Sequence, residues 1–189
     1  MSCYLGLSKR NDEYYTPAYA VKALLPYIKE KSTIWCPFDK QWSEFVRILT
    51  EHNHKVIFSH IDEGKDFFHY EPQESYDYII SNPPFSKKRE ILQRLNTLNK
   101  PYAMLLPINL LNDNYSNVLD SSLELIIFDR RIEFKGRNIN GNHISFKTIY
   151  FCKNFLNLPH SIVFAPLNRN KEDEQIASLT WNVHFFGTF

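Results

Sequence analysis

The sequence predicts an α/β fold in which a mostly parallel sheet has helices on both faces and an antiparallel C-terminal hairpin. Two observations predict this class. Short β-branched, apolar stretches alternate with stretches whose apolar residues recur at helical spacing, as in successive β-α-β units. The last two apolar stretches are instead separated by a polar, asparagine-rich segment, residues 129–145. This segment indicates a long loop and an antiparallel pair of strands that closes one edge of the sheet.

Length and composition exclude several classes of protein. The chain has 189 residues, 43% apolar and 15% aromatic, which suffices for one domain with a single core. Its 22 Lys and Arg balance 21 Asp and Glu, so the net charge of +1 argues against a nonspecific polybasic binder. The five glycines form neither a G-x-G-x-x-G loop nor a phosphate loop with its Lys and Ser or Thr. Two common nucleotide-binding folds are therefore excluded.

The cysteines and the N-terminus bear on the cellular compartment. Cys3, Cys36 and Cys152 are too scattered for a disulfide framework or a Cys-x-x-Cys metal site. No signal peptide is recognisable, and no apolar run approaches the roughly 18 residues that a membrane span needs. His52 and His54 lack the spacing of a metal site. We expect a cytoplasmic protein without metal or membrane association.

Helices and strands alternate over most of the chain. Thr16 is expected to cap a first helix, with Pro17 in its first turn. A second helix is expected to follow Asp39 and to end at His52, and Ser86 is expected to cap a third. The expected strands are residues 33–35, 55–61, 76–80, 102–106, 123–128 and 146–152. Because ligands of such sheets bind beyond the carboxyl ends of the strands, chemistry is expected directly after each strand.

The tetrapeptide Asn82-Pro83-Pro84-Phe85 follows the strand at 76–80 and precedes a helix. Such a sequence can simply end a strand, but it also suits a specific chemistry. An exocyclic amine is a poor nucleophile because its lone pair is delocalised, and two acceptors that bind both its hydrogens free that lone pair. The Asn82 side-chain oxygen and the Pro83 carbonyl supply two acceptors on a rigid backbone. Phe85 offers a ring on which a planar substrate can stack.

The tetrapeptide resembles the (Asp/Asn/Ser)-Pro-Pro-(Tyr/Phe/Trp) motif of the class I S-adenosylmethionine-dependent amino-methyltransferases, chiefly the adenine-N6 nucleic-acid methyltransferases. The resemblance runs in order over residues 12–152 and is closest to small phage-encoded members. It implies one Rossmann-like methyltransferase domain over residues 1–189, with a C-terminal extension at 153–189, in the cytoplasm of a bacterium or a phage-infected host. It also implies S-adenosylmethionine as the cofactor. The implied catalytic residues are Asn82, Pro83, Pro84 and Phe85.

The same resemblance implies the cofactor contacts. Residues 12–17 match an N-terminal element that lies against the methionine part of the cofactor. Asp66-Phe67 matches the Asp-Phe that meets its adenine, the Asp accepting from the amino group. Residues 105–107 and 130–134 match the later Leu-Pro element and the segment that leads into the hairpin. The implied cofactor-binding residues are Tyr14, Tyr15, Thr16, Pro17, Pro37, Phe38, Asp39, Lys40, Asp62, Asp66, Phe67 and Asn82.

The loop after the first strand departs from the family pattern Asp-Pro-Phe-x-Gly-x-Gly. Cys36 stands in place of the Asp, and Lys40 and Trp42 stand in place of the glycines that let the backbone approach the cofactor. Lys40 can pair with the cofactor carboxylate instead, and Phe38 or Tyr14 can face the sulfonium.

The end of the second strand departs as well. The family has an acid there for the ribose hydroxyls, whereas this chain has Ser59-His60, and Asp62 is the expected substitute. These departures predict weak or unusual cofactor binding and leave its loss open. Several residues also have structural alternatives: Asp66 can cap a turn, Thr16-Pro17 can be a simple helix entry, and Trp42 can belong to the core.

Positive charge near the motif indicates a nucleic-acid substrate. The run at 87–89 opens a helix, where cations oppose the helix dipole, so phosphate contact is an alternative to a solvated first turn. Arg130 and its neighbours flank the loop at 129–145 in the same way. The candidate substrate-binding residues are Lys87, Lys88, Arg89, Arg131, Lys135, Arg137 and His143.

The expected function is methylation of the exocyclic amino group of adenine in nucleic acid, with DNA favoured over RNA. Target recognition is weakly encoded, so we expect a loose sequence preference, a protein partner that supplies specificity, or a homodimer that doubles the contact surface. The alternatives are an RNA adenine methyltransferase, a protein-glutamine methyltransferase, and a catalytically inactive binding protein on the same fold, such as a phage factor that occupies a host target. The tail beyond residue 158 carries no recognisable motif, and its apolar end at 181–186 can pack on the sheet or on a second subunit.

Overall fold

The structure, a computed structural model, describes residues 14–112, 117–134 and 146–167. The described strands form one seven-stranded sheet in the order β2-β1-β3-β4-β6-β5-β7. The strands are β1 (Thr33–Cys36), β2 (Lys55–Phe58), β3 (Tyr78–Ser81), β4 (Tyr102–Pro107), β5 (Leu123–Phe128), β6 (Thr148–Lys153) and β7 (Ile162–Ala165). The helices are α1 (Ala18–Lys22), α2 (Glu44–Glu51) and α3 (Lys88–Leu98), with 3₁₀ turns η1 (Leu25–Tyr27), η2 (Ile61–Glu63), η3 (Phe85–Lys87) and η4 (Ile108–Asn112).

Strand direction confirms the predicted fold class. β2, β1, β3 and β4 run parallel, and β6 is antiparallel to both of its neighbours, β4 and β5. A single antiparallel strand inserted beside the C-terminal half of a parallel sheet is typical of the class I methyltransferase fold. One expectation is wrong: the antiparallel pair does not close the edge of the sheet. β7 pairs in parallel with β5 and forms that edge, with Phe128 opposite Ala165.

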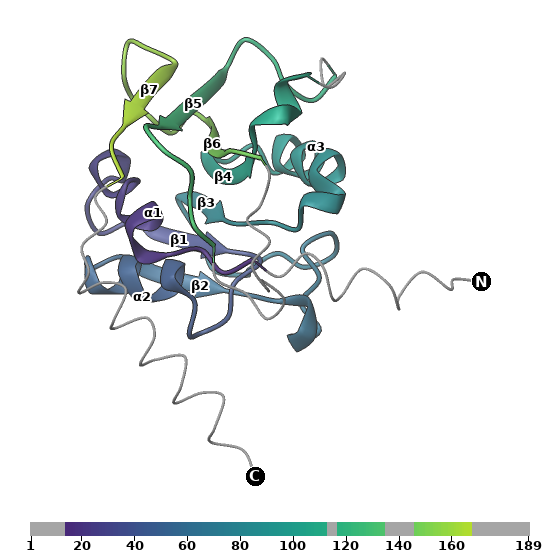
Figure 1. Cartoon of the computed structure of the whole chain (residues 1–189). Helices are drawn as coiled ribbons and strands as arrows, with labels where there is room; N and C mark the ends of the chain where they lie inside the picture. The colour runs from purple at the N-terminus through teal and green to yellow at the C-terminus, as the bar shows by residue number, and fades with distance from the viewer. Residues whose placement is uncertain (1–13, 113–116, 135–145, 168–189) are drawn as a thin grey trace.

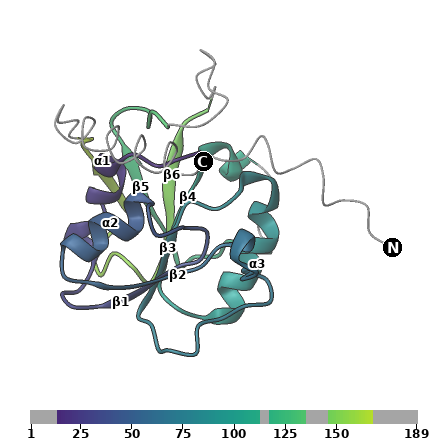
Figure 2. The same ribbon diagram turned by 90° about the horizontal axis from the view of Figure 1, so that it is seen from below.

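Helices cover both faces of the sheet, as predicted. α1 and α2 lie together on one face and α3 lies on the other (Figures 1 and 2). The buried side chains divide accordingly: Ile34 and Ile80 point toward α1 and α2, and Ile79 and Met104 point toward α3. Neighbouring residues of one strand thus enter different cores, because side chains alternate across a sheet.

The starts of the first and third helices differ from the sequence prediction. Pro17, with an extended ψ of 153°, is the N-cap of α1, and Thr16 does not cap it. A residue before proline is disfavoured in helical geometry, which moves the start of the helix beyond the Thr-Pro pair. Ser86 does not cap α3 either, because it lies inside the 3₁₀ turn η3, and Lys87 precedes the helix without a side-chain cap.

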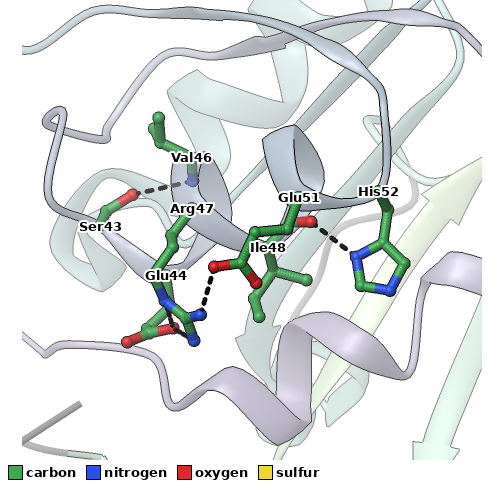
Figure 3. A network of polar contacts seen from close by, with 7 residues as sticks. All are labelled: Ser43, Glu44, Val46, Arg47, Ile48, Glu51 and His52. Carbon is green, nitrogen blue, oxygen red and sulfur yellow. Dashed lines mark hydrogen bonds and ion pairs between the residues drawn. The ribbon is translucent and has the colours of Figure 1, made fainter. Parts of the chain in front are cut away.

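α2 begins and ends close to where the sequence predicts. The Ser43 hydroxyl accepts from the backbone N–H of Val46, as an N-cap should. Arg47 pairs with Glu44 at 2.6 Å and with Glu51 at 2.7 Å, one turn away in each direction. His52 ends the helix, with its Nδ1 2.8 Å from the carbonyl of Ile48 (Figure 3). This capped helix start anchors one end of the loop that follows β1.

Within the described ranges, no helix is both long and apolar enough to cross a lipid bilayer.

Candidate functional site

The motif Asn82-Pro83-Pro84-Phe85 lies where the sequence predicts it, at the carboxyl end of a central strand. β3 ends at Ser81, the next three residues are extended, and η3 begins at Phe85. Pro84 has φ −62° and ψ 126°, so the chain turns toward α3 only after the second proline. The carboxyl ends of the parallel strands β1 and β4 flank β3, which gathers the loops after all three strands at one edge of the sheet.

The side chain of Asn82 is held by a long-range contact. Its Nδ2 donates to the backbone carbonyl of Tyr14 at 2.9 Å, a bond between residues 68 apart in the sequence. Its Oδ1 is buried and has no hydrogen-bond partner among the residues that the structure describes. Buried acceptors of this kind are rare in folded proteins, and each calls for an explanation such as a missing ligand. Because the nitrogen is engaged, the oxygen is the atom left to meet a donor.

Aromatic rings surround the motif. Tyr14 stacks on Phe85 with ring centroids 5.9 Å apart and an interplanar angle of 19°. Phe146 meets Phe85 edge-on at 5.7 Å, and Phe134 packs against Tyr14 at 5.9 Å. Phe85 is only partly buried. The ring that the sequence predicts as a stacking platform therefore lies in an aromatic cluster to which the N-terminal segment also contributes.

The loop after β1 places Asp39 in the interior. Its side chain is 7% exposed, and its Oδ2 accepts from the Ser81 hydroxyl at 2.5 Å. Burial raises the pKa of Asp39 to about 6, against the opposing effect of hydrogen bonds from Ser81 and Ser43. The neighbouring Cys36 is also fully buried, and its pKa is raised by burial and by the charge of Asp39. Pro37 is buried too, whereas Phe38 is partly buried and packs on Phe67 at 4.9 Å.

Two expected cofactor contacts are paired with one another. The Lys40 ammonium lies 2.8 Å from Oδ2 of Asp62, and the two side chains are 30% and 40% exposed. Asp62 lies in η2, whose N-cap His60 accepts from the backbone N–H of Asp62. The pair thus joins the loops that follow β1 and β2 at the carboxyl edge.

Other predicted positions are engaged inside the protein. Ser59 stands at the end of the second strand, where the resembled family has an acid. It is fully buried and accepts from the indole N–H of Trp35 at 2.9 Å. One oxygen of Asp66 accepts from the backbone N–H of Phe68, the turn-capping geometry noted as the alternative. Phe67 is 2% exposed and packs on Trp35. Cofactor contact by these residues stays a prediction.

The N-terminal element contributes a second orphaned atom. Thr16 and Pro17 are buried, and within residues 14–112, 117–134 and 146–167 the Thr16 hydroxyl has no hydrogen-bond partner. Tyr15 meets the ring of Trp42 at 5.1 Å. Thr148, the first residue of β6 and opposite the end of β4, carries the third side-chain atom at this edge that has no partner among the described residues, its hydroxyl oxygen. No sequence pattern distinguishes Thr148, because a β-branched residue at the start of a strand is ordinary.

The basic residues near the motif are in part engaged by neighbours. Lys87 is exposed, with its ammonium 5.3 Å from the centre of the Phe68 ring. Arg89 donates to the side chain of Asn117 at 2.8 Å, and Lys88 is partly buried. Arg131 is exposed. The predicted residues Lys135, Arg137 and His143 lie outside the described residues.

The donor set at this edge suits S-adenosylmethionine in charge and hydrogen-bonding type. Lys40 offers a cation for a carboxylate, Asp62 an acceptor for hydroxyls, and Asp66 an acceptor for an amino group. The orphaned atoms of Thr16 and Asn82 show polar groups at the same edge that nothing in the described chain satisfies. The Lys40–Asp62 ion pair limits the fit. To bind the cofactor, the two side chains must either separate or contact the ligand while they remain paired.

Comparison with known proteins finds only distant likenesses to solved structures. No family model matches the sequence, and no curated protein matches it. Among solved structures, the chain is similar to the methyltransferase subunit of a type I restriction-modification system from Streptococcus thermophilus, with 13% identity, 90% of this chain and 53% of that chain covered, and a TM-score of 0.45. The chain thus spans about half of that subunit. It is also similar to the 23S rRNA methyltransferase ErmE, with 12% identity, coverage of 86% and 74%, and a TM-score of 0.42.

Likenesses this distant do not identify a substrate. The sheet order defines the class: the protein has the fold of the S-adenosylmethionine-dependent class I methyltransferases.

Proposed function

We propose that this protein is an S-adenosylmethionine-dependent methyltransferase that acts on the exocyclic amino group of adenine in nucleic acid, DNA being favoured over RNA. The observation that supports this proposal most directly is the buried, unpartnered Oδ1 of Asn82 at the end of β3. An exocyclic amine carries two N–H donors and is the type of group that this oxygen and the adjacent Pro83 carbonyl would bind together.

The chain's own residues would bind and orient the amine. The Tyr14 carbonyl fixes the side-chain amide of Asn82, so the acceptor does not need to reorient when a substrate arrives. Pro83 and Pro84 restrict the backbone that carries the second acceptor. Phe85 supplies a ring for the base, which would enter from a single strand or be flipped out of a duplex. For the base to stack there, Tyr14 must shift from its present place on Phe85.

The loops after β1 and β2 would bind the cofactor. Lys40, Asp62 and Asp66 are the residues proposed to hold S-adenosylmethionine, which when bound would supply an electrophilic methyl group. The chain does not need a strong general base, since an aromatic amine loses its proton readily once alkylated. Proximity supplies much of the acceleration in such a reaction.

A non-catalytic binding protein on this fold is the second candidate. Two observations favour it: Lys40 and Asp62 pair with one another, and Ser59 is used by Trp35 inside the protein. A protein that had lost its cofactor would be free to keep such internal contacts. The retained unpartnered oxygen of Asn82 argues for the enzyme, because that oxygen destabilises the fold and serves no described contact.

Calorimetry with S-adenosylmethionine and transfer of a labelled methyl group to DNA, RNA and protein extracts would test the proposal. We expect binding and transfer to DNA, and we expect Asn82→Ala to abolish transfer while it leaves cofactor binding nearly intact. Asn96→Ala is the matched control, because the Asn96 side chain also donates to a distant backbone carbonyl, that of Val118, at 2.9 Å.

The other outcomes separate the alternatives. Transfer to RNA or to glutamine in protein would replace the proposed substrate. No binding at millimolar cofactor would favour the non-catalytic protein. Loss of cofactor binding in Asn82→Ala would show that the motif does not serve the amine. A need for a second copy or another protein in the transfer assay would identify the partner that supplies specificity.

A further inference from the structure

One buried carboxylate connects three elements at the candidate site. Asp39, in the loop after β1, accepts from the hydroxyl of Ser81, the last residue of β3. It also accepts from the hydroxyl of Ser43, the N-cap of α2. Asp39 and Ser81 lie 42 residues apart in sequence and are 7% and 0% exposed. Asp39 therefore lies behind the motif, where it contacts the protein and leaves little surface for a ligand.

In the described part of the chain, no cation balances the charge of this carboxylate. Its pKa is affected by burial and by the two serine hydroxyls, and no lysine, arginine or histidine among the described residues contributes. The titratable groups that face it from other strands are the Cys36 thiol on β1 and the Tyr150 phenol on β6. Burial raises the pKa of both groups well above their ordinary values, so both are neutral near pH 7. Lys40, the next residue in sequence, pairs with Asp62 instead.

A buried, unpaired carboxylate destabilises a fold, and an amide of the same shape would avoid that penalty. Residues that weaken the fold in this way are concentrated at functional sites. The position of the hydrogen bond indicates what the carboxylate does. Ser81 is the residue directly before Asn82, so a bond that holds Ser81 also holds the backbone from which Asn82 and Pro83 present their oxygens.

We propose that Asp39 is a positioning residue. Its hydrogen bond to Ser81 couples the loop after β1 to the amine-binding motif and holds the Asn82 side chain in the orientation that binds the amine. Its catalytic consequence rests on the proposed methyltransferase function, whereas the coupling itself does not. The ionised carboxylate accepts a stronger hydrogen bond from Ser81 than the neutral acid does. Methyl transfer should therefore weaken as the pH falls through about 6, the pKa of Asp39.

The kinetic test compares Asp39→Asn and Ser81→Ala with Asp77→Asn. Asp77 also links β1 to the start of β3, because it accepts a 2.8 Å hydrogen bond from the N–H of Thr33. This bond lies at the amino-terminal ends of the strands, away from the candidate site, and Asp77 is exposed. We expect Asp39→Asn and Ser81→Ala each to lower kcat about tenfold, with the KM for S-adenosylmethionine within about twofold of wild type. In Asp39→Asn the loss of activity below pH 6 should also disappear. Asp77→Asn should change neither quantity.

If Asp39 had only a structural role, Asp39→Asn would lose activity below pH 6 just as the wild type does. Its kcat would then fall only in proportion to the fraction of unfolded protein. Denaturation curves of each variant measure that fraction directly. Wild-type kcat and an unchanged pH profile in folded Asp39→Asn would overturn the proposal. So would equal losses in Asp39→Asn and Asp77→Asn.

A second measurement does not depend on catalysis. We expect the ¹H–¹⁵N resonances of the Asn82 side-chain amide to shift with pH, with a midpoint near 6 in the wild type, and to stay constant in Asp39→Asn. If no substrate is methylated but this titration occurs, the methyltransferase function fails and the coupling stands. If methyl transfer occurs but the Asn82 resonances do not respond to Asp39, the coupling is wrong and the function stands.

Discussion

The two halves of the candidate site differ in how their polar groups are satisfied. In the amine-binding half, the Oδ1 of Asn82 is buried without a partner, while its Nδ2 is fixed by Tyr14. In the cofactor half, Lys40 and Asp62 pair with one another. An unmet buried acceptor destabilises a protein by about 1–3 kcal/mol, whereas a satisfied one does not. The Asn82 acceptor is thus fixed before a substrate binds, although the Tyr14 ring must still leave Phe85. Cofactor binding must first break the contact between Lys40 and Asp62.

The largest effect is expected from Asn82→Leu, which removes both polar atoms at nearly constant volume. Methyl transfer should fall by about 1,000-fold, because the acceptor that orients the amine is lost. The free energy of unfolding should change by about 1 kcal/mol or less, since a lost hydrogen bond is offset by removal of an unsatisfied oxygen. Labelled-methyl transfer and urea denaturation measure the two quantities. Retained transfer in a folded variant would contradict the proposed role of Asn82.

The next largest effect concerns the residue that joins the two halves. The pKa of Asp39 rises from 3.8 to about 6 on folding, so the folded state binds this proton more tightly. The resulting stability is fully present below pH 4 and is lost as the pH rises through 6. Relative to Asp39→Asn, the wild type should therefore lose about 2.4 kcal/mol between pH 4 and pH 7.

Urea denaturation of both proteins at several pH values measures this difference, and the comparison removes the contributions of all other carboxylates. Parallel stability curves would mean that the Asp39 carboxyl is not buried as described. In that case the two halves would no longer share a common anchor.

The elements of this fold could be predicted because they depend on local sequence. The strand at 123–128 is predicted residue for residue, and the motif at Asn82 was located by the strand before it and the helix after it. β7 was missed because its four residues lie in a tail without a repeating pattern, and only pairing with β5 makes them a strand. The predicted helix start at Thr16 is wrong because the following proline disfavours helical geometry there, and the one at Ser86 is wrong because Ser86 lies inside a 3₁₀ turn.

The contacts that define the site could not be predicted in the same way. The sequence predicts Asp39, Lys40 and Asp62 as three separate residues that each contact a cofactor. The fold instead brings Lys40 to Asp62 across 22 residues and Asp39 to Ser81 across 42. Which polar group satisfies which depends on strand order and register, and neither is encoded in the spacing of residues. Ser81 and Ser43 were missed for this reason.

A tenfold effect is expected from the ion pair in the cofactor half. If Lys40 holds the cofactor carboxylate, Lys40→Met should weaken S-adenosylmethionine binding about tenfold, with kcat at saturating cofactor nearly unchanged. The free energy of unfolding should change by less than about 1 kcal/mol, because both partners are partly exposed. Calorimetry measures the affinity, and Asp62→Asn reports on the other partner. Unchanged or tighter binding in Lys40→Met would mean that the Lys40–Asp62 pair blocks the cofactor site and does not bind the cofactor. This result would favour the non-catalytic protein.

The smallest effect is expected at the rim of the amine-binding half. Lys87 is exposed in the turn between the motif and α3. If it contacts phosphate, Lys87→Gln should weaken DNA binding about threefold and lower the salt slope of log K by about one. Lys55→Gln makes the same charge change at the amino-terminal start of β2, where Lys55 pairs with Glu74, and should leave both quantities unchanged. Equal losses in the two variants would indicate a general charge effect rather than a nucleic-acid path beside Asn82. A loss of DNA binding confined to Lys87→Gln would mean that nucleic acid contacts the amine-binding half of the site, beside the Asn82 acceptor.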